Sequence, residues 1–203
     1  MSEVVSGAGE WRLGLPSLTG SIVTLRELRS GDAVSLLASL STDEVSRFIS
    51  PPPTTLEGYD RFISWTHEQR TAGRYVCFGI VPHGVESAVG LFQVRALDSE
   101  FAIAEWGFAL ASEYWGSGIF MDAAPLVLEF GFATLGIHRI EARAAVQNGR
   151  GNGALRKIGA VQEGVLRRAF LRRGEYHDQG LWSILRGDWR RPPSPASPRR
   201  TLH

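Results

Sequence analysis

The chain has 203 residues, of which 43% are hydrophobic, and its formal net charge is +1. This length suffices for one domain with a sizeable core, and no apolar run reaches the roughly 18 residues that a membrane span requires. The N-terminus lacks a basic region followed by an apolar one, and the lone Cys77 excludes an internal disulfide. We therefore expect a cytoplasmic protein with no membrane partner.

The charge is unevenly distributed along the chain. The segment from Arg190 onward holds four arginines and no acidic residue, which leaves 18 basic against 21 acidic residues, about −3, in the remainder. This segment is also rich in Pro and Ser, so residues 190–203 are predicted to be a disordered tail. A weak electrostatic role of the tail on an anionic partner is the alternative. A slightly acidic body argues against a dedicated nucleic-acid binder.

The first 20 residues contain Gly, Ser and Pro without hydrophobic periodicity and predict a flexible arm. The alternative is that Trp11 and Leu13 pack onto the body. Residues 22–28 alternate well enough to predict a strand. Ser30 then begins a helix through residue 40 whose apolar positions share one face.

Two segments with capping-box spacing follow. The first, from Ser41 to Glu44, predicts a short helix that ends near Ile49, before three consecutive prolines. The second, from Thr54 to Glu57, predicts a longer helix that ends near Gly73.

Three strands are predicted next, at residues 75–81, 89–97 and 101–110, separated by Gly- and Asp-containing turns. Cys77 falls in the first of them, which favours a buried, inert thiol. The long apolar segment at residues 119–135 predicts a buried helix, which Pro125 should kink because it removes one backbone hydrogen bond.

The rest of the chain completes an α/β pattern. A strand at residues 139–146, a short helix ending near Gly159 and a hairpin of residues 161–171 and 176–185 are predicted. Strands before, between and after helices indicate one α/β layer domain, which we place at residues 21–189.

The most informative junction is the one where residues 101–110 give way to the buried helix. Gly116 and Gly118 lie there one residue apart. Glycines at such a position let backbone N–H groups close on an anion, and the following helix N-terminus adds partial positive charge. A phosphate-bearing cofactor is the guest that this arrangement favours. The alternative is a tight turn in which the glycines serve geometry alone.

The surrounding motifs favour the first interpretation. Glu113-x-x-Gly116-x-Gly118 resembles the acyl-CoA pyrophosphate loop of the GNAT acyltransferase superfamily. Residues 22–28, 135–142, 147–160 and 174–179 resemble, in the right order, further motifs of its branch of ribosomal-protein N-acetyltransferases, the RimJ/RimL-like enzymes. Together these matches extend over residues 21–189.

This resemblance implies the fold and the activity. The fold would be a mixed, mostly antiparallel sheet flanked by helices, with parallel fourth and fifth strands that splay apart. The activity would be transfer of an acetyl group from acetyl-CoA to a primary amine, either a protein N-terminus or a small-molecule amine or amino acid. A homodimer is one option that the resemblance also leaves open.

The resemblance also implies site residues. The cofactor would lie against Phe108, Ala109, Leu110, Trp115, Gly116, Ser117, Gly118, Ile119, Phe120, Met121 and Asn148. For Asn148, a helix N-cap is an alternative that can hold at the same time. The acceptor would contact Phe48, Tyr59, Phe62 and Tyr176, for which core packing is the alternative.

Glu105 is the candidate catalytic base. It is the only charged residue between Phe101 and Leu110, and it aligns with the acid that this branch often carries on its fourth strand. Partial burial would raise the pKa of a carboxyl group toward the working pH and improve it as a base. The alternative is a structural acid paired with Arg143 or Arg139.

Two departures from the family pattern stand out. Many relatives have a serine three residues after the asparagine, where this chain has Gly151, and the following helix contains no tyrosine. The proton donor to the leaving thiolate is therefore not identified; water or a hydroxyl such as that of Tyr176 would serve.

Other kinds of site are not supported by spacing. The five histidines lack metal-ligand spacing, so no metal is expected, and neither glycine-rich segment is a nucleoside-triphosphate loop. Two alternatives to the enzyme remain: a catalytically weak CoA-binding regulatory or interaction domain, which Gly151 favours, and a ribosome- or RNA-associated module. The sequence does not identify the acceptor.

Overall fold

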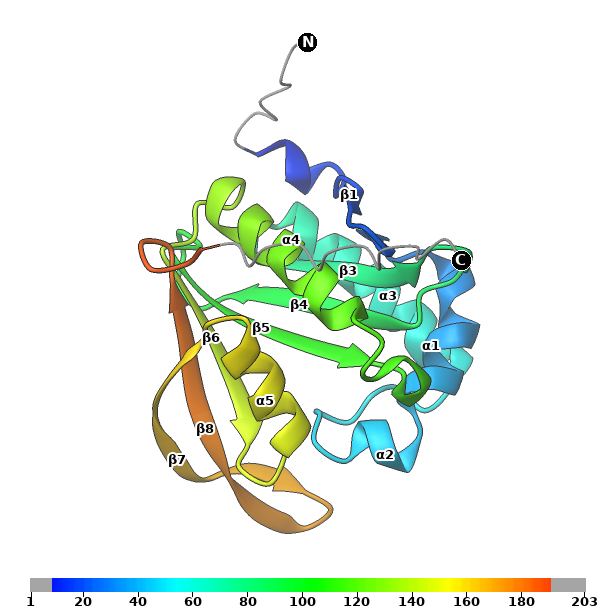
Figure 1. Cartoon of the computed structure of the whole chain (residues 1–203). Coiled ribbons are helices and arrows are strands. Elements are labelled where there is room, and N and C mark those ends of the chain that lie inside the picture. The colour runs from blue at the N-terminus through cyan, green and yellow to red at the C-terminus, as the bar shows by residue number, and fades with distance from the viewer. Residues whose placement is uncertain (1–8, 191–203) are drawn as a thin grey trace, which may run out of the picture.

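An eight-stranded sheet in the order β1-β2-β3-β4-β5-β6-β8-β7 forms the centre of the protein (Figure 1). The structure is a computed structural model that describes residues 9–190. The strands are β1 (Leu18–Thr19), β2 (Val23–Glu27), β3 (Tyr75–Pro82), β4 (Gly90–Ala96), β5 (Ile103–Leu110), β6 (Arg139–Ala145), β7 (Val161–Arg172) and β8 (Glu175–Leu185). The seven strands predicted from the sequence are all present, and their ends differ by two residues at most.

Helices cover both faces of the sheet. They are α1 (Ala33–Leu40), α2 (Asp43–Ser46), α3 (Leu56–Thr71), α4 (Ile119–Ala133) and α5 (Gly149–Lys157). Figure 1 shows α4 and α5 in front of the sheet and α1 and α3 behind it. The helix α4 is one element that continues through Pro125. The predicted single α/β domain is confirmed.

The parallel pair at the centre of the sheet is the predicted one, and it separates as predicted. All strand pairs are antiparallel except β5 and β6, which pair only from Ile103 and Arg139 to Glu105 and Glu141. Beyond Glu105, β5 still pairs with β4 as far as Leu110, and β6 still pairs with β8 as far as Ala145. The facing edges of β5 and β6 therefore diverge and have no partner strand.

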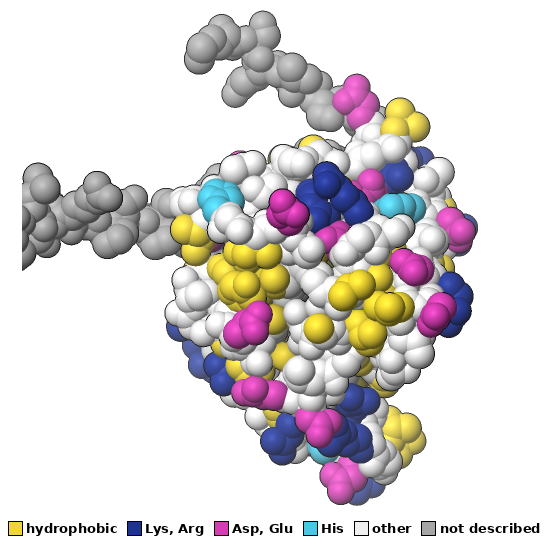
Figure 2. Space-filling view, turned by 90° about the vertical axis from the view of Figure 1, so that its right-hand side faces the viewer, with side chains coloured by type: hydrophobic (Ala, Val, Ile, Leu, Met, Phe, Trp, Pro, Cys, Tyr) yellow, Lys and Arg dark blue, Asp and Glu magenta, His cyan; other side chains and the backbone are white. Residues whose placement is uncertain are grey.

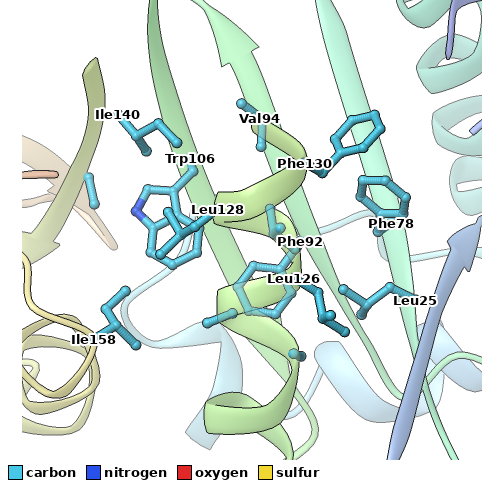
Figure 3. Packing of buried hydrophobic residues seen from close by; sticks show 14 of the residues in the cluster. Leu25, Phe78, Phe92, Val94, Trp106, Leu126, Leu128, Phe130, Ile140 and Ile158 are labelled. Carbon is cyan, nitrogen blue, oxygen red and sulfur yellow. The ribbon is translucent and has the colours of Figure 1, made fainter. Parts of the chain in front are cut away.

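The larger core lies between α4 and the sheet (Figure 3). Phe92 stacks on Trp106 with ring centroids 5.5 Å apart, and Phe78 meets Phe130 edge-on at 5.2 Å. A smaller core lies between α1, α3 and the other face of the sheet. Because side chains alternate along a strand, Trp106 and Phe108 face α4, whereas Glu105, Gly107 and Ala109 belong to the opposite face.

The predicted flexible arm needs correction where the structure describes it. Trp11 is buried and meets Phe101 edge-on at 5.9 Å, and β1 pairs with β2. Leu13, in contrast, is exposed. Residues 9–20 are thus tied to the domain through Trp11 and β1. The remainder of the predicted arm, residues 1–8, and the predicted tail from residue 191 lie outside the described residues.

The N-terminal hairpin is also anchored to α4. The carboxylate of Asp122 accepts hydrogen bonds from the backbone N–H groups of Ser21 and Ile22 at 3.0 and 2.8 Å. A side chain on Gly20 would place its Cβ 2.3 Å from this carboxylate, so glycine is required at that position.

The N-caps of α2 and α3 lie one residue later than the capping-box spacing predicted. Thr42 and Thr55 are the N-caps, and their hydroxyl groups accept hydrogen bonds from the backbone N–H groups of Val45 and Gly58. Ser41 is instead the C-cap of α1, so α2 begins immediately after α1 and ends at Ser46 rather than near Ile49.

A buried ion pair joins β2 to the segment before α1. Asp32 accepts two hydrogen bonds from Arg26, both at 2.8 Å, and further ones from the backbone N–H groups of Arg29 and Ala88. The pair connects β2, the start of α1 and the β3–β4 connection.

Two further predictions concern the burial of Cys77 and membrane spanning. Cys77 is buried in β3, as expected, and burial raises the pKa of its thiol above the usual value. Within residues 9–190, no helix is long and apolar enough to cross a membrane.

Candidate active site

The loop between β5 and α4 has the backbone of an anion site. Gly116 and Gly118 have φ angles of +77° and +90°, a region that side-chain-bearing residues rarely adopt. Four backbone N–H groups at this position make no hydrogen bond within residues 9–190: those of Gly116, Gly118, Phe120 and Met121. They lie at the N-terminus of the 15-residue helix α4, whose dipole adds positive charge.

Neighbouring side chains fix this loop. The indole N–H of Trp115 donates to the carbonyl oxygen of Leu110 at 2.9 Å, and the hydroxyl group of Ser117 donates to the carbonyl oxygen of Tyr114 at 2.6 Å. The Trp115 bond holds the loop at the end of β5, where β5 and β6 have diverged. The loop, the diverging edges and the start of α4 therefore lie in one region.

Arg150, which the sequence did not single out, brings α5 to the same region. Its guanidinium lies 4.1 Å from the centroid of the Trp115 ring, a cation–π contact. Arg150 forms no ion pair within the described residues. No sequence signal identified it, because its partner lies 35 residues earlier in the chain.

Asn148 is the N-cap of α5, as its alternative interpretation predicted. Its side-chain oxygen accepts a hydrogen bond from the backbone N–H of Gly151 at 2.9 Å. The side-chain NH₂ group makes no hydrogen bond within the described residues and remains able to donate one. A cofactor contact through this group is compatible with the capping role.

Glu105 lies at the last position where β5 pairs with β6, and two arginines contact its carboxylate. Its Oε1 accepts from Arg143 at 3.0 Å, and its Oε2 contacts the guanidinium of Arg95. Arg143 was a predicted partner. Arg139, the other predicted partner, is occupied instead by Glu141 and Glu163.

Arg95 was missed, although an antiparallel register between residues 89–97 and 101–110 would have revealed it. It lies directly opposite Glu105 in that register. Opposite charges at such positions stabilise a sheet. The two guanidinium groups orient the Glu105 carboxylate.

The ion pairs continue across one face of the sheet. Glu141 contacts both Arg139 and Arg143, and Arg139 also binds Glu163 in β7. Hydrogen bonds from Arg139 and from the Ser183 hydroxyl group hold the pKa of Glu163 at about 2. Within this row each carboxylate has an arginine partner, so the row orients side chains without adding net charge.

One of the predicted acceptor residues lines a pocket beyond the diverging strands. The pocket has a volume of about 620 Å³ and lies between α2 and the β7–β8 hairpin. Its lining residues are Asp43, Glu44, Arg47, Phe48, Gln147, Arg172, Arg173, Glu175 and His177. Figure 2 shows acidic and basic side chains crowded together at the lower end of the face that includes α2.

Contacts between α2 and the hairpin frame this pocket. Arg172 donates to the carbonyl oxygen of Ser46 at 2.8 and 3.1 Å, and Arg173 pairs with Asp43. These partners are more than 120 residues apart in the sequence. The fold alone brings them together.

Comparison with known proteins identifies the family. A family model of the acetyltransferase (GNAT) domain matches residues 23–161, well over half of the chain. The chain belongs to the GNAT acetyltransferase family. The predicted membership is thereby confirmed, and the chain is an acetyl-transferring enzyme.

Individual relatives agree with this assignment. The chain is 29% identical over 176 residues to the uncharacterized N-acetyltransferase YoaA of Bacillus subtilis (strain 168), a match that covers 84% of this chain and 97% of that protein. It is 22% identical over 133 residues to the ribosomal protein uS5-alanine N-acetyltransferase of Escherichia coli (strain K12), with coverage of 65% and 69%.

The fold is shared with a solved enzyme of the predicted branch. Mycobacterium smegmatis RimJ in complex with CoA-disulfide matches with a TM-score of 0.76 at 23% identity, over 85% of this chain and 87% of that one. The predicted GNAT-like fold, with its diverging parallel strands, is therefore confirmed.

The structure explains one departure from the GNAT pattern. A Cβ on Gly151 would lie 2.6 Å from the side-chain nitrogen of Asn148. A serine at this position would therefore force the N-cap side chain to move. The observed capping geometry of Asn148 therefore requires glycine rather than serine at position 151.

One of the predicted acceptor residues needs correction. Tyr59 is 1% exposed and packs in the core behind the sheet, so its ring is not available to a substrate. Burial raises the pKa of its hydroxyl group to about 12. Tyr176 is 62% exposed at the start of β8 and does not line the pocket beside α2, so its role as an acceptor contact stays a prediction.

Phe62 has an intermediate position. It is partly buried on α3 and stacks on Trp65 with ring centroids 6.2 Å apart. Its role as an acceptor contact stays a prediction. For residues 9–190, no cluster of three or more His, Cys, Asp or Glu side chains has the arrangement to hold a metal ion.

Proposed function

We propose that this GNAT enzyme transfers an acetyl group from acetyl-CoA to a primary amine. The observation that carries the proposal is the set of four unpaired backbone N–H groups at the N-terminus of α4, directly beside the diverging edges of β5 and β6. An anionic, extended cofactor satisfies both features, because it brings phosphates to the N–H groups and amides to an unpaired strand edge.

The residues present fit acetyl-CoA. The backbone of residues 116–121 would hold the pyrophosphate, and the free edge at Phe108, Ala109 and Leu110 would pair with the amides of the pantetheine arm. The free amide of Asn148 would donate to the same arm. The thioester supplies an activated acyl group whose thiol, with a pKa of about 8.5, leaves tolerably well as thiolate.

Glu105 would accept the proton of the acceptor ammonium, directly or through a water molecule. Amines of this kind have pKa values of about 8 to 10, so most of the acceptor is protonated at neutral pH and must lose a proton before it attacks. The Glu105 carboxylate is 22% exposed and precedes the strand edge that would hold the cofactor. Arg95 is 54% exposed and is free to move aside when an acceptor arrives.

For the acceptor we propose two classes of amine, whereas for the donor we propose a single compound, acetyl-CoA. The name of the Escherichia coli relative supports the N-terminal alanine of a ribosomal protein as one class to test. Small-molecule amines and amino acids form the other class. Phe48, which lines the pocket beside α2, is one predicted acceptor contact that a ligand can reach.

A thiol-release assay with acetyl-CoA, run across a panel of N-terminal peptides, amino acids and polyamines, tests this proposal. We expect amine-dependent release of CoA with at least one class, and mass spectrometry should show the acetyl group on nitrogen. Tight CoA binding without release for any amine would contradict the proposal.

The donor site has its own prediction, Gly118→Val. We expect CoA affinity to fall at least tenfold, or about 1.4 kcal/mol, because a branched side chain strains a φ of +90° and crowds the approach to the loop. Calorimetric titration with CoA measures the effect.

Gly136→Val is the matched control for Gly118→Val. Gly136 also has a positive φ, +76°, with open space around it, but it lies at the far end of α4 from the loop. The control should lose stability through the same backbone strain and keep its CoA affinity. Equal CoA affinity in both folded variants would remove Gly118 from the donor site.

A further inference from the structure

A second pocket lies on the same face of the sheet as Glu105. Its volume is about 490 Å³, and it is formed where the end of α3, the start of β3 and the end of β4 meet. It is lined by Arg12, Trp65, Gln69, Ala72, Gly73, Arg74, Tyr75, Arg95, Ala96, Leu97, Asp98 and Ser99. We call it the arginine pocket.

The arginine pocket is positively charged. Three arginines line it against one acid, Asp98. Within residues 9–190, neither Arg12 nor Arg74 takes part in a salt bridge. These cations are available to an anionic group of a ligand.

Asp98 does not neutralise these arginines by contact. Its carboxylate accepts hydrogen bonds from the backbone N–H groups of Glu100, Ala102 and Ile103. Desolvation opposes them, yet these hydrogen bonds hold the pKa of Asp98 below its usual value. The carboxylate is thus held by its own loop, and within residues 9–190 it forms no salt bridge with the arginines of the pocket.

The pocket also has an aromatic wall. Trp65 is 43% exposed although it is a large apolar residue, and it meets the ring of buried Tyr75 edge-on at 4.9 Å. The Tyr75 hydroxyl group donates to Gln93 at 2.5 Å, which fixes the ring. An exposed tryptophan beside unpaired cations suits a ligand that has both an apolar body and an anionic group.

Arg95 connects the arginine pocket with the proposed catalytic base. Its side chain lines the pocket, and its guanidinium pairs with Oε2 of Glu105. A ligand can therefore present an amine at Glu105 and an anion at the arginines from one position. An anion in the pocket also competes with Glu105 for Arg95.

We propose that the arginine pocket receives the carboxylate and the apolar body of a small amino-carboxylate acceptor whose amine lies at Glu105. This assignment rests on the proposed function, which leaves the acceptor class open, and it selects amino acids and related compounds over polyamines. When the carboxylate of the ligand binds, it draws Arg95 away from Glu105. The Glu105 side chain is then freer to accept the ammonium proton.

Matched acceptors test this selection. L-Phenylalanine and 2-phenylethylamine share the same aromatic body and differ in the carboxylate. We expect kcat/KM for phenylalanine to be at least tenfold higher, and Arg74→Ala should remove most of this preference because it raises KM for phenylalanine far more than KM for phenylethylamine. Arg61→Ala, an exposed arginine on α3 outside both pockets, should change neither acceptor.

A binding measurement separates this inference from the proposed function. 3-Phenylpropionate has the body and the carboxylate but no amine, so its binding needs no acetyl transfer. Calorimetry should show that it binds the wild-type chain and binds Arg74→Ala at least tenfold more weakly, whereas Arg61→Ala behaves as wild type. No binding, or binding that Arg74→Ala leaves unchanged, overturns the pocket even if amines are acetylated. Binding that depends on Arg74 supports it even if the acetyl donor proves to be different.

Discussion

Glu105→Gln is expected to lower kcat by about 10²- to 10⁴-fold while CoA affinity hardly changes. The substitution keeps the size of the side chain and one acceptor oxygen for the two arginines, and it removes the group that takes the proton. The deficit should shrink at high pH, because more of the acceptor amine is then already deprotonated. Steady-state kinetics across a pH series, together with CoA titration, measure both effects.

Glu141→Gln provides the matched control for this variant. Glu141 lies beside Glu105 in the parallel register, belongs to the same row of ion pairs and also contacts Arg143. If Glu105 serves only to hold arginines, the two variants should lose similar stability and keep the pH profile of the wild type. Near-normal turnover of Glu105→Gln at neutral pH would leave deprotonation to water or to the substrate.

Asp32→Asn should lower the free energy of unfolding by about 3 to 5 kcal/mol. We expect this loss to exceed those of Glu105→Gln and Glu141→Gln. Asp32 is 2% exposed, and the variant would leave the guanidinium of Arg26 buried without its counter-charge. The new amide nitrogen would also face backbone N–H donors in place of an acceptor oxygen. Urea denaturation measures the loss.

The effect of pH on this variant has a defined sign. Burial acts to raise the pKa of Asp32, but the hydrogen bonds from Arg26, Ala88 and Arg29 outweigh it and hold that pKa below its usual value. The stabilisation is therefore fully present above the unfolded-state pKa of about 3.9 and is lost as the pH falls through the lower folded-state value. The gap between wild type and Asp32→Asn should narrow below about pH 4.

Asp60→Asn is the control for replacing a carboxylate by an amide at an exposed position. Asp60 is exposed on α3, so its replacement should stay within about 0.5 kcal/mol of wild type at every pH. A loss for Asp32→Asn no larger than this would show that the buried pair contributes little to stability.

Local patterns in the sequence determined the helices, the strands and the glycine-containing loop between β5 and α4. Hydrophobic period distinguishes a strand such as residues 101–110 from the helix that follows, because a side chain recurs on one face every two residues in one and every 3.6 in the other. The positions of Gly116 and Gly118 predicted the loop, since only glycine adopts their backbone angles without strain. Asn148 predicted the start of α5, because its short side chain caps a helix from within the same turn.

Contacts between distant segments were decided by tertiary structure alone. The sequence identified Glu105 as a candidate base, but its contact with Arg95 follows from the register of β4 and β5. The burial of Tyr59 depends on how α3 packs behind the sheet. The arginine pocket joins residues 12, 65–75 and 95–99, which no local pattern relates. Hydrophobic period states which side of an element is buried, whereas strand register and helix packing decide what that side meets, and these depend on the whole core at once.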